Sequence, residues 1–117
     1  MKIKEIVGIL NAEVLYGNEH LDNLVVAAGG ADLMNDVLAA ATEGAVLLTG
    51  VTTEHVLRTA KIAGVAVVVF VRGKEPAPSI VDLARSYQMP LLRTRYSLFV
   101  ACGRLYMEGL RGLDGSW

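Results

Sequence analysis

Basic side chains, hydroxyl groups and glycines follow three short apolar runs of the sequence. The basic ones come directly after the runs at 65–71 and 91–92, and they are Arg72, Lys74, Arg93 and Arg95. The hydroxyl groups come after the run at 45–48, and they are Thr49, Thr52 and Thr53. Guanidinium, ammonium and hydroxyl groups, together with the backbone amides of turns, are the groups with which proteins bind phosphate or carboxylate. The chemistry that these residue types indicate is the binding of a small anion.

Apolar runs of strand length alternate along the chain with stretches of helical period. The runs at 24–28, 45–48, 65–71 and 91–92 lack polar residues at every second position, which is typical of strands buried on both faces. Apolar residues three and four positions apart predict helices near 3–10, 34–41, 80–87 and 98–109. A further strand, at the edge of the sheet, is expected at Glu13–Tyr16.

This alternation predicts a layered α/β fold with a mainly parallel β-sheet flanked by helices. Because parallel strands bring the loops at their carboxyl ends to one edge, the basic and hydroxyl side chains are expected to converge there. The residues predicted to bind the ligand are Thr49, Gly50, Thr52, Arg72, Gly73, Lys74 and Arg95. In the alternative reading, these turns are only solvated strand ends, and Thr52 or Thr53 and a capping box of Ser79 and Asp82 begin the helices that follow.

Catalytic and metal-binding patterns are not evident in the sequence. The pair Gly73-Lys74 lacks the flanking residues of a P-loop, and Gly29-Gly30 lacks the third glycine of a dinucleotide fingerprint. Cys102 has no evident base partner, and one cysteine with two histidines offers too few ligands for a structural zinc site. We therefore predict a protein that is not an enzyme and that needs no metal and no cofactor.

Length, composition and charge limit the class of protein and its partners. The 117 residues suit one domain, and a hydrophobic content of 53% with 20% charged residues indicates surface buried in an oligomer, for which a homodimer is expected. The formal net charge of -1 gives no field to hold nucleic acid or an acidic membrane, so neither is expected as a partner. Without a signal-peptide pattern or a run of about 20 apolar residues, the protein is expected to be cytoplasmic. Residues 111–117 are expected to form a frayed tail.

Four phrases of the sequence resemble the stand-alone members of the DRTGG domain family. They are ADLMNDVLA at 31–39, LLTGVTTEHVLRTA at 47–60, VVFVRGKEP at 68–76 and ACGRLYMEGL at 101–110. The resemblance extends over nearly the whole chain. It implies a fold similar to the N-terminal domain of HPr kinase/phosphorylase and a regulatory role, since the CBS-containing relatives carry the domain as a dimer-forming part of nucleotide-regulated assemblies.

The residues that give this family its name are altered in the chain. After the Thr-Gly turn at 49–50, the residues at 51–53 are Val-Thr-Thr, where other members have an Asp-Arg pair. At 71–73 the chain has Val-Arg-Gly in place of Thr-Gly-Gly, so only the final glycine is kept. A ligand bound by the name residues of other members therefore need not bind here.

Two functional hypotheses follow. In the first, the protein is a homodimeric regulatory module that binds a nucleotide or a phosphorylated metabolite at the carboxyl edge of the sheet. In the second, it binds no small ligand and is an interaction or scaffold module. Similar stand-alone proteins are encoded beside iron hydrogenase subunits, so the resemblance implies a redox protein as that partner. The apolar residues on one side of the last helix suit an interface as well as the core, and they are Leu98, Cys102, Leu105 and Tyr106.

Overall fold

The computed structural model describes residues 1–33 and 43–113 as layers of helices on a central sheet. The sheet has five strands in the order β1-β5-β4-β3-β2. They are β1 (Glu13–Tyr16), β2 (Ala27–Gly30), β3 (Ala45–Thr49), β4 (Val67–Phe70) and β5 (Leu91–Arg93). Strands β2 to β5 pair in parallel, and β1 pairs antiparallel with β5. The predicted α/β class and its mainly parallel sheet are confirmed, and so is the edge strand.

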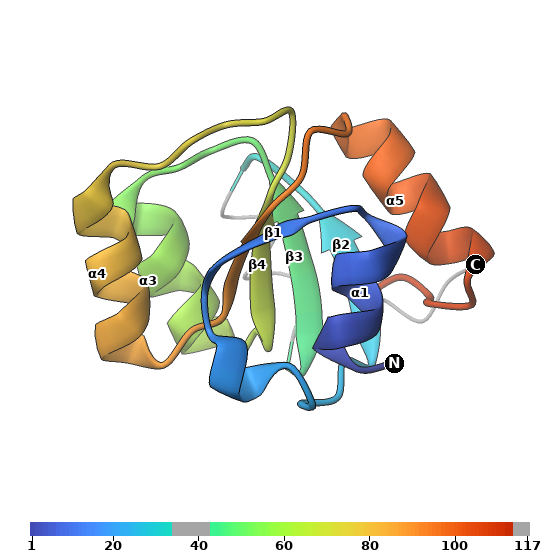
Figure 1. The fold of residues 1–117 in the computed structure, drawn as a ribbon, viewed down its shortest axis with the longest axis horizontal. Coiled ribbons are helices and arrows are strands. Elements are labelled where there is room, and N and C mark those ends of the chain that lie inside the picture. The colour runs from blue at the N-terminus through green and yellow to red at the C-terminus, as the bar shows by residue number, and fades with distance from the viewer. Residues whose placement is uncertain (34–42, 114–117) are drawn as a thin grey trace.

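Helices cover both faces of the sheet. In Figure 1, α3 (Glu54–Ala63) and α4 (Pro78–Tyr87) lie on one side, and α1 (Ile3–Ile9) and α5 (Leu98–Met107) lie on the other. A short 3-10 helix, η1 (Asn18–His20), follows β1. The helix predicted near 34–41 falls outside the described residues. No helix in the described part of the chain has both the length and the apolar character needed to cross a membrane.

Strand β4 is apolar throughout, and β3 is apolar up to its last residue, Thr49, because neither strand has a face in contact with water. Every residue of both strands is buried. Leu47 and Phe70 belong to the core on the side of α3 and α4, whereas Val69 and Leu105 belong to the core on the side of α1 and α5. Burial of one such large side chain contributes about 1.5 to 3 kcal/mol. The polar groups that end these strands are therefore confined to the edges of the sheet.

The strand predicted at 24–28 is shifted in the structure. β2 begins only at Ala27, and Leu24 and Val26 are 65% and 69% exposed. The reason is that β2 is an edge strand, which pairs with β3 alone and is not enclosed as the central strands are. The prediction of burial on both faces is therefore wrong for this run.

The segment after α5 packs along β2. The N–H of Ala28 donates to the carbonyl of Arg111 at 2.8 Å. A Cβ on Gly29 would collide with the side chain of Leu113, so a glycine is needed where the segment crosses the strand. Residues 111–113 of the predicted tail thus lie along β2, and residues 114–117 lie outside the described ones.

The charged turn after β4 does not lead directly into a helix. Helix α4 begins at Pro78 with Ala77 as its N-cap, and no side chain accepts a capping hydrogen bond there. Proline suits the first helical position because its missing N–H would have no partner in the helix. The capping box of Ser79 and Asp82 is therefore absent, and the residues between β4 and α4 form a loop at the edge of the sheet.

Two glycine substitutions test the packing of the C-terminal segment on β2. We expect Gly29→Ala to lower the free energy of unfolding by about 1 to 2 kcal/mol, because its Cβ would collide with Leu113. Gly103→Ala in α5 is the control, because its Cβ would meet no atom within 4 Å. This control should raise the free energy of unfolding by about 1 kcal/mol, the helix propensity difference. Urea unfolding followed by circular dichroism measures both, and equal effects of the two changes would contradict the packing.

Candidate anion site at the carboxyl edge of the sheet

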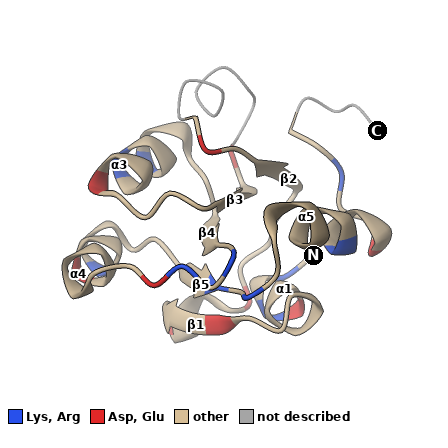
Figure 2. Cartoon of the chain, turned by 90° about the horizontal axis from the view of Figure 1, so that it is seen from above, with Lys and Arg blue, Asp and Glu red and all other residues tan. Residues whose placement is uncertain are grey.

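The loops that follow β3, β4 and β5 meet at the upper edge of the sheet in Figure 1. Figure 2 looks onto this edge and shows basic segments beside the ends of β4 and β5, with acidic segments among them. A hollow of about 510 Å³ opens there, and it is lined by Arg72, Gly73, Glu75, Arg93 and Arg95. Three of the predicted ligand-binding residues, Arg72, Gly73 and Arg95, are thus neighbours around one hollow.

A tight turn at 71–74 presents the first of these side chains. Arg72 and Gly73 have φ values of 60° and 67°, and the N–H of Lys74 donates to the carbonyl of Val71 at 3.2 Å. Positive φ at both central residues favours glycine or asparagine, so an arginine there is strained by about 1 kcal/mol or more. The N–H groups of Arg72 and Gly73 donate to carbonyls of the loop between β5 and α5, at 2.8 and 2.9 Å. Because these amides are already used, they are not available to a ligand, and the turn presents the side chain of Arg72 instead.

Asp32, which the sequence reasoning left out of the site, lies at the end of β3. Its Oδ1 accepts hydrogen bonds from the Thr49 hydroxyl at 3.1 Å and from the Gly50 N–H at 2.9 Å. Its Oδ2 lies 3.6 Å from a guanidinium nitrogen of Arg72. The Gly50 hydrogen bond, with smaller contributions from Thr49 and Arg72, lowers the pKa of Asp32 below its ordinary value against the opposing effect of desolvation. The Asp32 carboxylate is thus an anion of the chain itself that contacts Thr49, Gly50 and Arg72.

A signal for Asp32 was present in the sequence. The residue follows β2, and β2 is parallel to β3, so its loop reaches the same edge as the Thr-Gly turn. A carboxylate in that loop is therefore placed to accept from the hydroxyl and the amide at the neighbouring strand end.

Arg93, the last residue of β5, is compensated by two carboxylates. Its guanidinium lies 3.0 Å from Oε2 of Glu13 and 3.6 Å from Oε2 of Glu75. Glu13 stands opposite Arg93 in the register of β1 and β5, so the antiparallel edge strand brings this acid into place. The Arg93 side chain is only 19% exposed. Arg93 therefore lines the hollow with a side chain that is held in place by ion pairs, and it contributes little uncompensated charge.

Arg95 and Lys74 pair with no carboxylate among the residues that the structure describes. Arg95 is exposed, and it lines both the large hollow and a smaller one of about 140 Å³ beside Asn11 and Tyr96. Lys74 is exposed on the turn and lines neither hollow. The predicted residue Thr52 is half-buried and also lines neither hollow. Of the predicted basic residues, Arg95 combines an uncompensated charge with a place in the hollow.

The lining of the large hollow suits an anion. Three guanidinium groups and one carboxylate face it. A guanidinium group binds phosphate or carboxylate through two parallel hydrogen bonds, which gives geometry as well as attraction. Among the described residues that line it, none is aromatic, so these residues offer no ring on which a base would stack. Within residues 1–33 and 43–113, no three histidine, cysteine, aspartate or glutamate side chains gather as metal ligands would.

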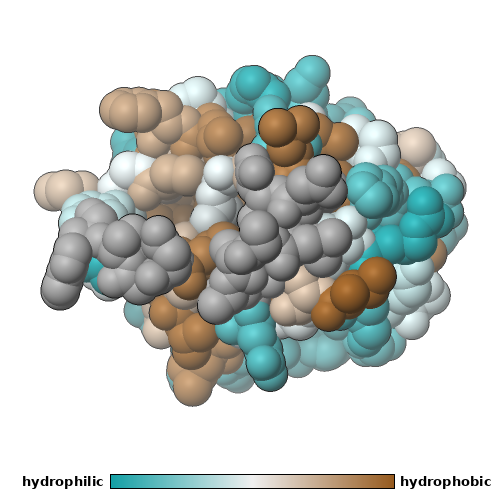
Figure 3. All heavy atoms as spheres, turned by 180° about the vertical axis from the view of Figure 1, so that it is seen from behind, coloured by the Kyte–Doolittle hydropathy of each residue, from teal (hydrophilic) through white to brown (hydrophobic). Residues whose placement is uncertain are grey.

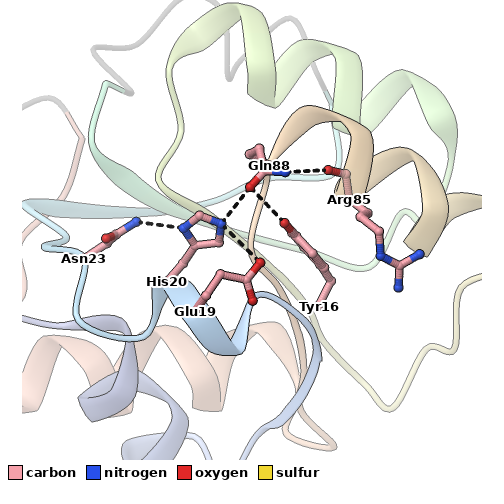
Figure 4. A network of polar contacts seen from close by, with 6 residues as sticks. All are labelled: Tyr16, Glu19, His20, Asn23, Arg85 and Gln88. Carbon is pink, nitrogen blue, oxygen red and sulfur yellow. Dashed lines mark hydrogen bonds and ion pairs between the residues drawn. The ribbon is translucent and has the colours of Figure 1, made fainter.

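A second group of polar side chains lies at the other end of the sheet and is shown in Figure 4. The side-chain oxygen of Gln88 accepts a hydrogen bond from the Tyr16 hydroxyl at 3.1 Å and lies 3.2 Å from Nε2 of His20. Burial raises the pKa of Tyr16, and the nearby negative charge of Glu19 acts in the same direction. Gln88 is the C-cap of α4, with a φ of 55°. These contacts therefore tie the end of α4 to β1 and η1, and their role is structural.

Comparisons with known proteins give three findings. The family model of the DRTGG domain matches residues 5–106. The chain is similar to a crystal structure of the CBS and DRTGG domains of the regulatory region of Clostridium perfringens pyrophosphatase, complexed with the activator diadenosine tetraphosphate, with a TM-score of 0.76 and 18% sequence identity. That match covers 89% of this chain and 45% of the other, so this chain spans less than half of that structure. No curated protein matches the sequence.

Substitution of Asp32 tests the electrostatics of the edge. Asp32→Asn keeps an oxygen for the Thr49 and Gly50 donors and removes the charge, so we expect a small loss of stability at neutral pH. Because the pKa of Asp32 is lower in the folded chain, the stability from its charge is present above its unfolded pKa of about 4 and is lost as the pH falls through the folded value. The free energies of unfolding of wild type and variant should converge in that range. A difference that stays constant into strong acid would contradict the contacts of the carboxylate.

Proposed function

Because this chain belongs to the DRTGG domain family, a family of regulatory domains and not of enzymes, we propose that it is a regulatory module that binds a small anionic ligand at the carboxyl edge of its sheet. The proposed ligand is a nucleotide or another phosphorylated metabolite. The regulatory region of Clostridium perfringens pyrophosphatase was crystallised with diadenosine tetraphosphate, and this supports the nucleotide class.

One observation carries the proposal, namely the excess of guanidinium groups around the hollow. Arg72, Arg93 and Arg95 line it together with a single acid, Glu75. Two of the three arginines have carboxylate partners, whereas Arg95 pairs with none in the described part of the chain. A ligand phosphate placed there would supply the missing negative charge and would be within reach of more than one guanidinium group.

The seven residues predicted from sequence take different roles in this proposal. Arg95 binds the ligand directly, and Arg72 binds it from the other side of the hollow. Gly73 permits the positive φ of the turn, and Lys74 adds positive charge near the hollow. The remaining residues lie on the side of β3, where two of them hold Asp32, and they are Thr49, Gly50 and Thr52.

Thermal unfolding in the presence of phosphorylated compounds tests ligand binding. We expect pyrophosphate, ATP or diadenosine tetraphosphate to stabilise the protein by about 2.7 kcal/mol when the ligand is at about 100 times its Kd. Arg95→Ala should abolish the shift in melting temperature. Arg58→Ala is the control, since Arg58 is an exposed arginine of α3 that pairs with Glu54 and does not line the hollow. No shift with any of these compounds at millimolar concentration would count against the proposal.

A second function, protein interaction, is favoured by the apolar surface of α5. Phe99 and Met107 lie eight residues apart on one face of the helix and are 86% and 83% exposed. Beside them is a hollow of about 530 Å³ between α1 and α5, which Ile9 and Val100 also line. Leu105, for which the sequence left core and interface open, is fully buried in the core on the α5 side of the sheet. On the other side of the molecule, Figure 3 shows hydrophobic side chains in several patches among hydrophilic ones.

The proposed occupant of the α5 surface is a second copy of the chain, which gives a homodimer, or else a redox protein. We expect wild-type protein to be a dimer by light scattering and Phe99→Asp to be a monomer of unchanged fold, because a carboxylate would be buried in the interface. Ile62→Asp is the matched control, since Ile62 is 79% exposed on α3, on the opposite face of the sheet. A strictly monomeric wild type would contradict the dimer. Failure to retain a redox protein in a pull-down would then contradict the other occupant.

A further inference from the structure

Asp32 occupies the place at the end of β3 where a bound anion would lie in a parallel sheet. Its two shorter contacts come from β3 itself, at 3.1 Å from the Thr49 hydroxyl and 2.9 Å from the Gly50 N–H. Thr49 is fully buried, so these donors are fixed in position. The carboxylate is thereby anchored to the strand end independently of Arg72.

The contact between Asp32 and Arg72 is weaker than the other two. The nitrogen and oxygen are 3.6 Å apart, beyond the usual range of about 2.7 to 3.2 Å for a hydrogen bond. Both side chains are partly exposed, at 49% for Arg72 and 43% for Asp32. Ion pairs of this kind contribute little to stability, so the guanidinium is free to exchange its partner.

Arg72 also belongs to the lining of the large hollow. Its backbone is fixed, because the turn at 71–74 is closed by a hydrogen bond and its N–H is tied to the loop before α5. Only the side chain of Arg72 can therefore move. Its guanidinium group can contact either of two anions, which are Asp32 on the side of β3 and a ligand in the hollow on the side of β5. Gly50 allows the first position, since a Cβ at residue 50 would overlap the guanidinium of Arg72.

We infer that Asp32 is an internal anion that competes with the ligand for Arg72, so that ligand binding in the hollow releases Arg72 from Asp32. The inference rests on the proposed function of the same edge. Binding of a ligand in the hollow, beside β4 and β5, would thus change the contacts of Asp32, which follows β2. Because a ligand binds only the fraction of molecules in which Arg72 is free, weakening the hold of Asp32 on Arg72 strengthens ligand binding.

Calorimetric titration with inorganic pyrophosphate tests this competition. We expect Asp32→Asn to bind pyrophosphate about two- to fivefold more tightly than the wild type, the range that corresponds to an exposed ion pair. Asp32→Asn retains an oxygen for Thr49 and Gly50, so its fold should persist. Gly50→Ala gives a second arm without any change of charge, because its methyl group would push the Arg72 guanidinium away from Asp32. It should also bind more tightly than the wild type.

The same titration in an Arg72→Ala background separates competition from simple repulsion. If Asp32 acts through Arg72, then Asp32→Asn gives no gain in this background. A gain of the same size with and without Arg72 would overturn the inference, since the charge of Asp32 would then act on the ligand directly. Equal affinities of wild type, Asp32→Asn and Gly50→Ala would also overturn it while leaving the proposed function intact. Absence of binding in every variant would overturn both.

Discussion

The burial of β4 on both faces is the constraint on which the rest of the structure depends. Its four residues pair with β3 and β5 and are covered by helices on each side, and Val71 after them is still fully buried. The chain can reach water only at the next residue, and it does so in a turn with two positive φ values. Because the amides of this turn are tied to the loop before α5, the guanidinium of Arg72 starts from a fixed point between the ends of β3 and β5. In a strand with one solvated face, a basic side chain could reach water from several positions along the strand, and its position would be less restricted.

Parallel pairing then crowds the charges of several loops onto one edge. Carboxylates from separate segments compensate the arginines, with Asp32 following β2, Glu13 in β1 and Glu75 after the turn. These ion pairs connect segments that are distant in sequence, and they leave Arg95 as the arginine of the hollow without such a partner in the described part of the chain. The hollow is lined by three arginines and one glutamate, and such a lining suits the recognition of charge. Such recognition suits a regulatory domain, in which the free energy of ligand binding is used to shift contacts and not to lower a reaction barrier.

The fold was largely accessible from the sequence, because continuous apolar runs predict strands buried on both faces and the period of 3.6 predicts three of the helices that cover them, α1, α4 and α5. The prediction of burial is wrong where the position of a strand within the sheet determines which side chains are covered. The edge position of β2 left Leu24 and Val26 exposed, although both belong to a continuous apolar run. For the site, parallel topology was enough to bring Arg72 and Arg95 to one edge. It was not enough to show which cations are compensated, since an ion pair depends on side-chain positions and not on the type or order of residues.

A titration of the isotope-labelled protein with pyrophosphate, followed by amide resonances in NMR spectra, tests the central claim most directly. The account predicts that the largest shifts occur at Gly50, Gly73 and Arg95, which surround the hollow and the Asp32 contacts. The amides of His20 and Gln88, in the polar group at the other end of the sheet, should not move. Shifts concentrated at that other end, or no shifts at saturating pyrophosphate, would show that the carboxyl edge is not an anion site.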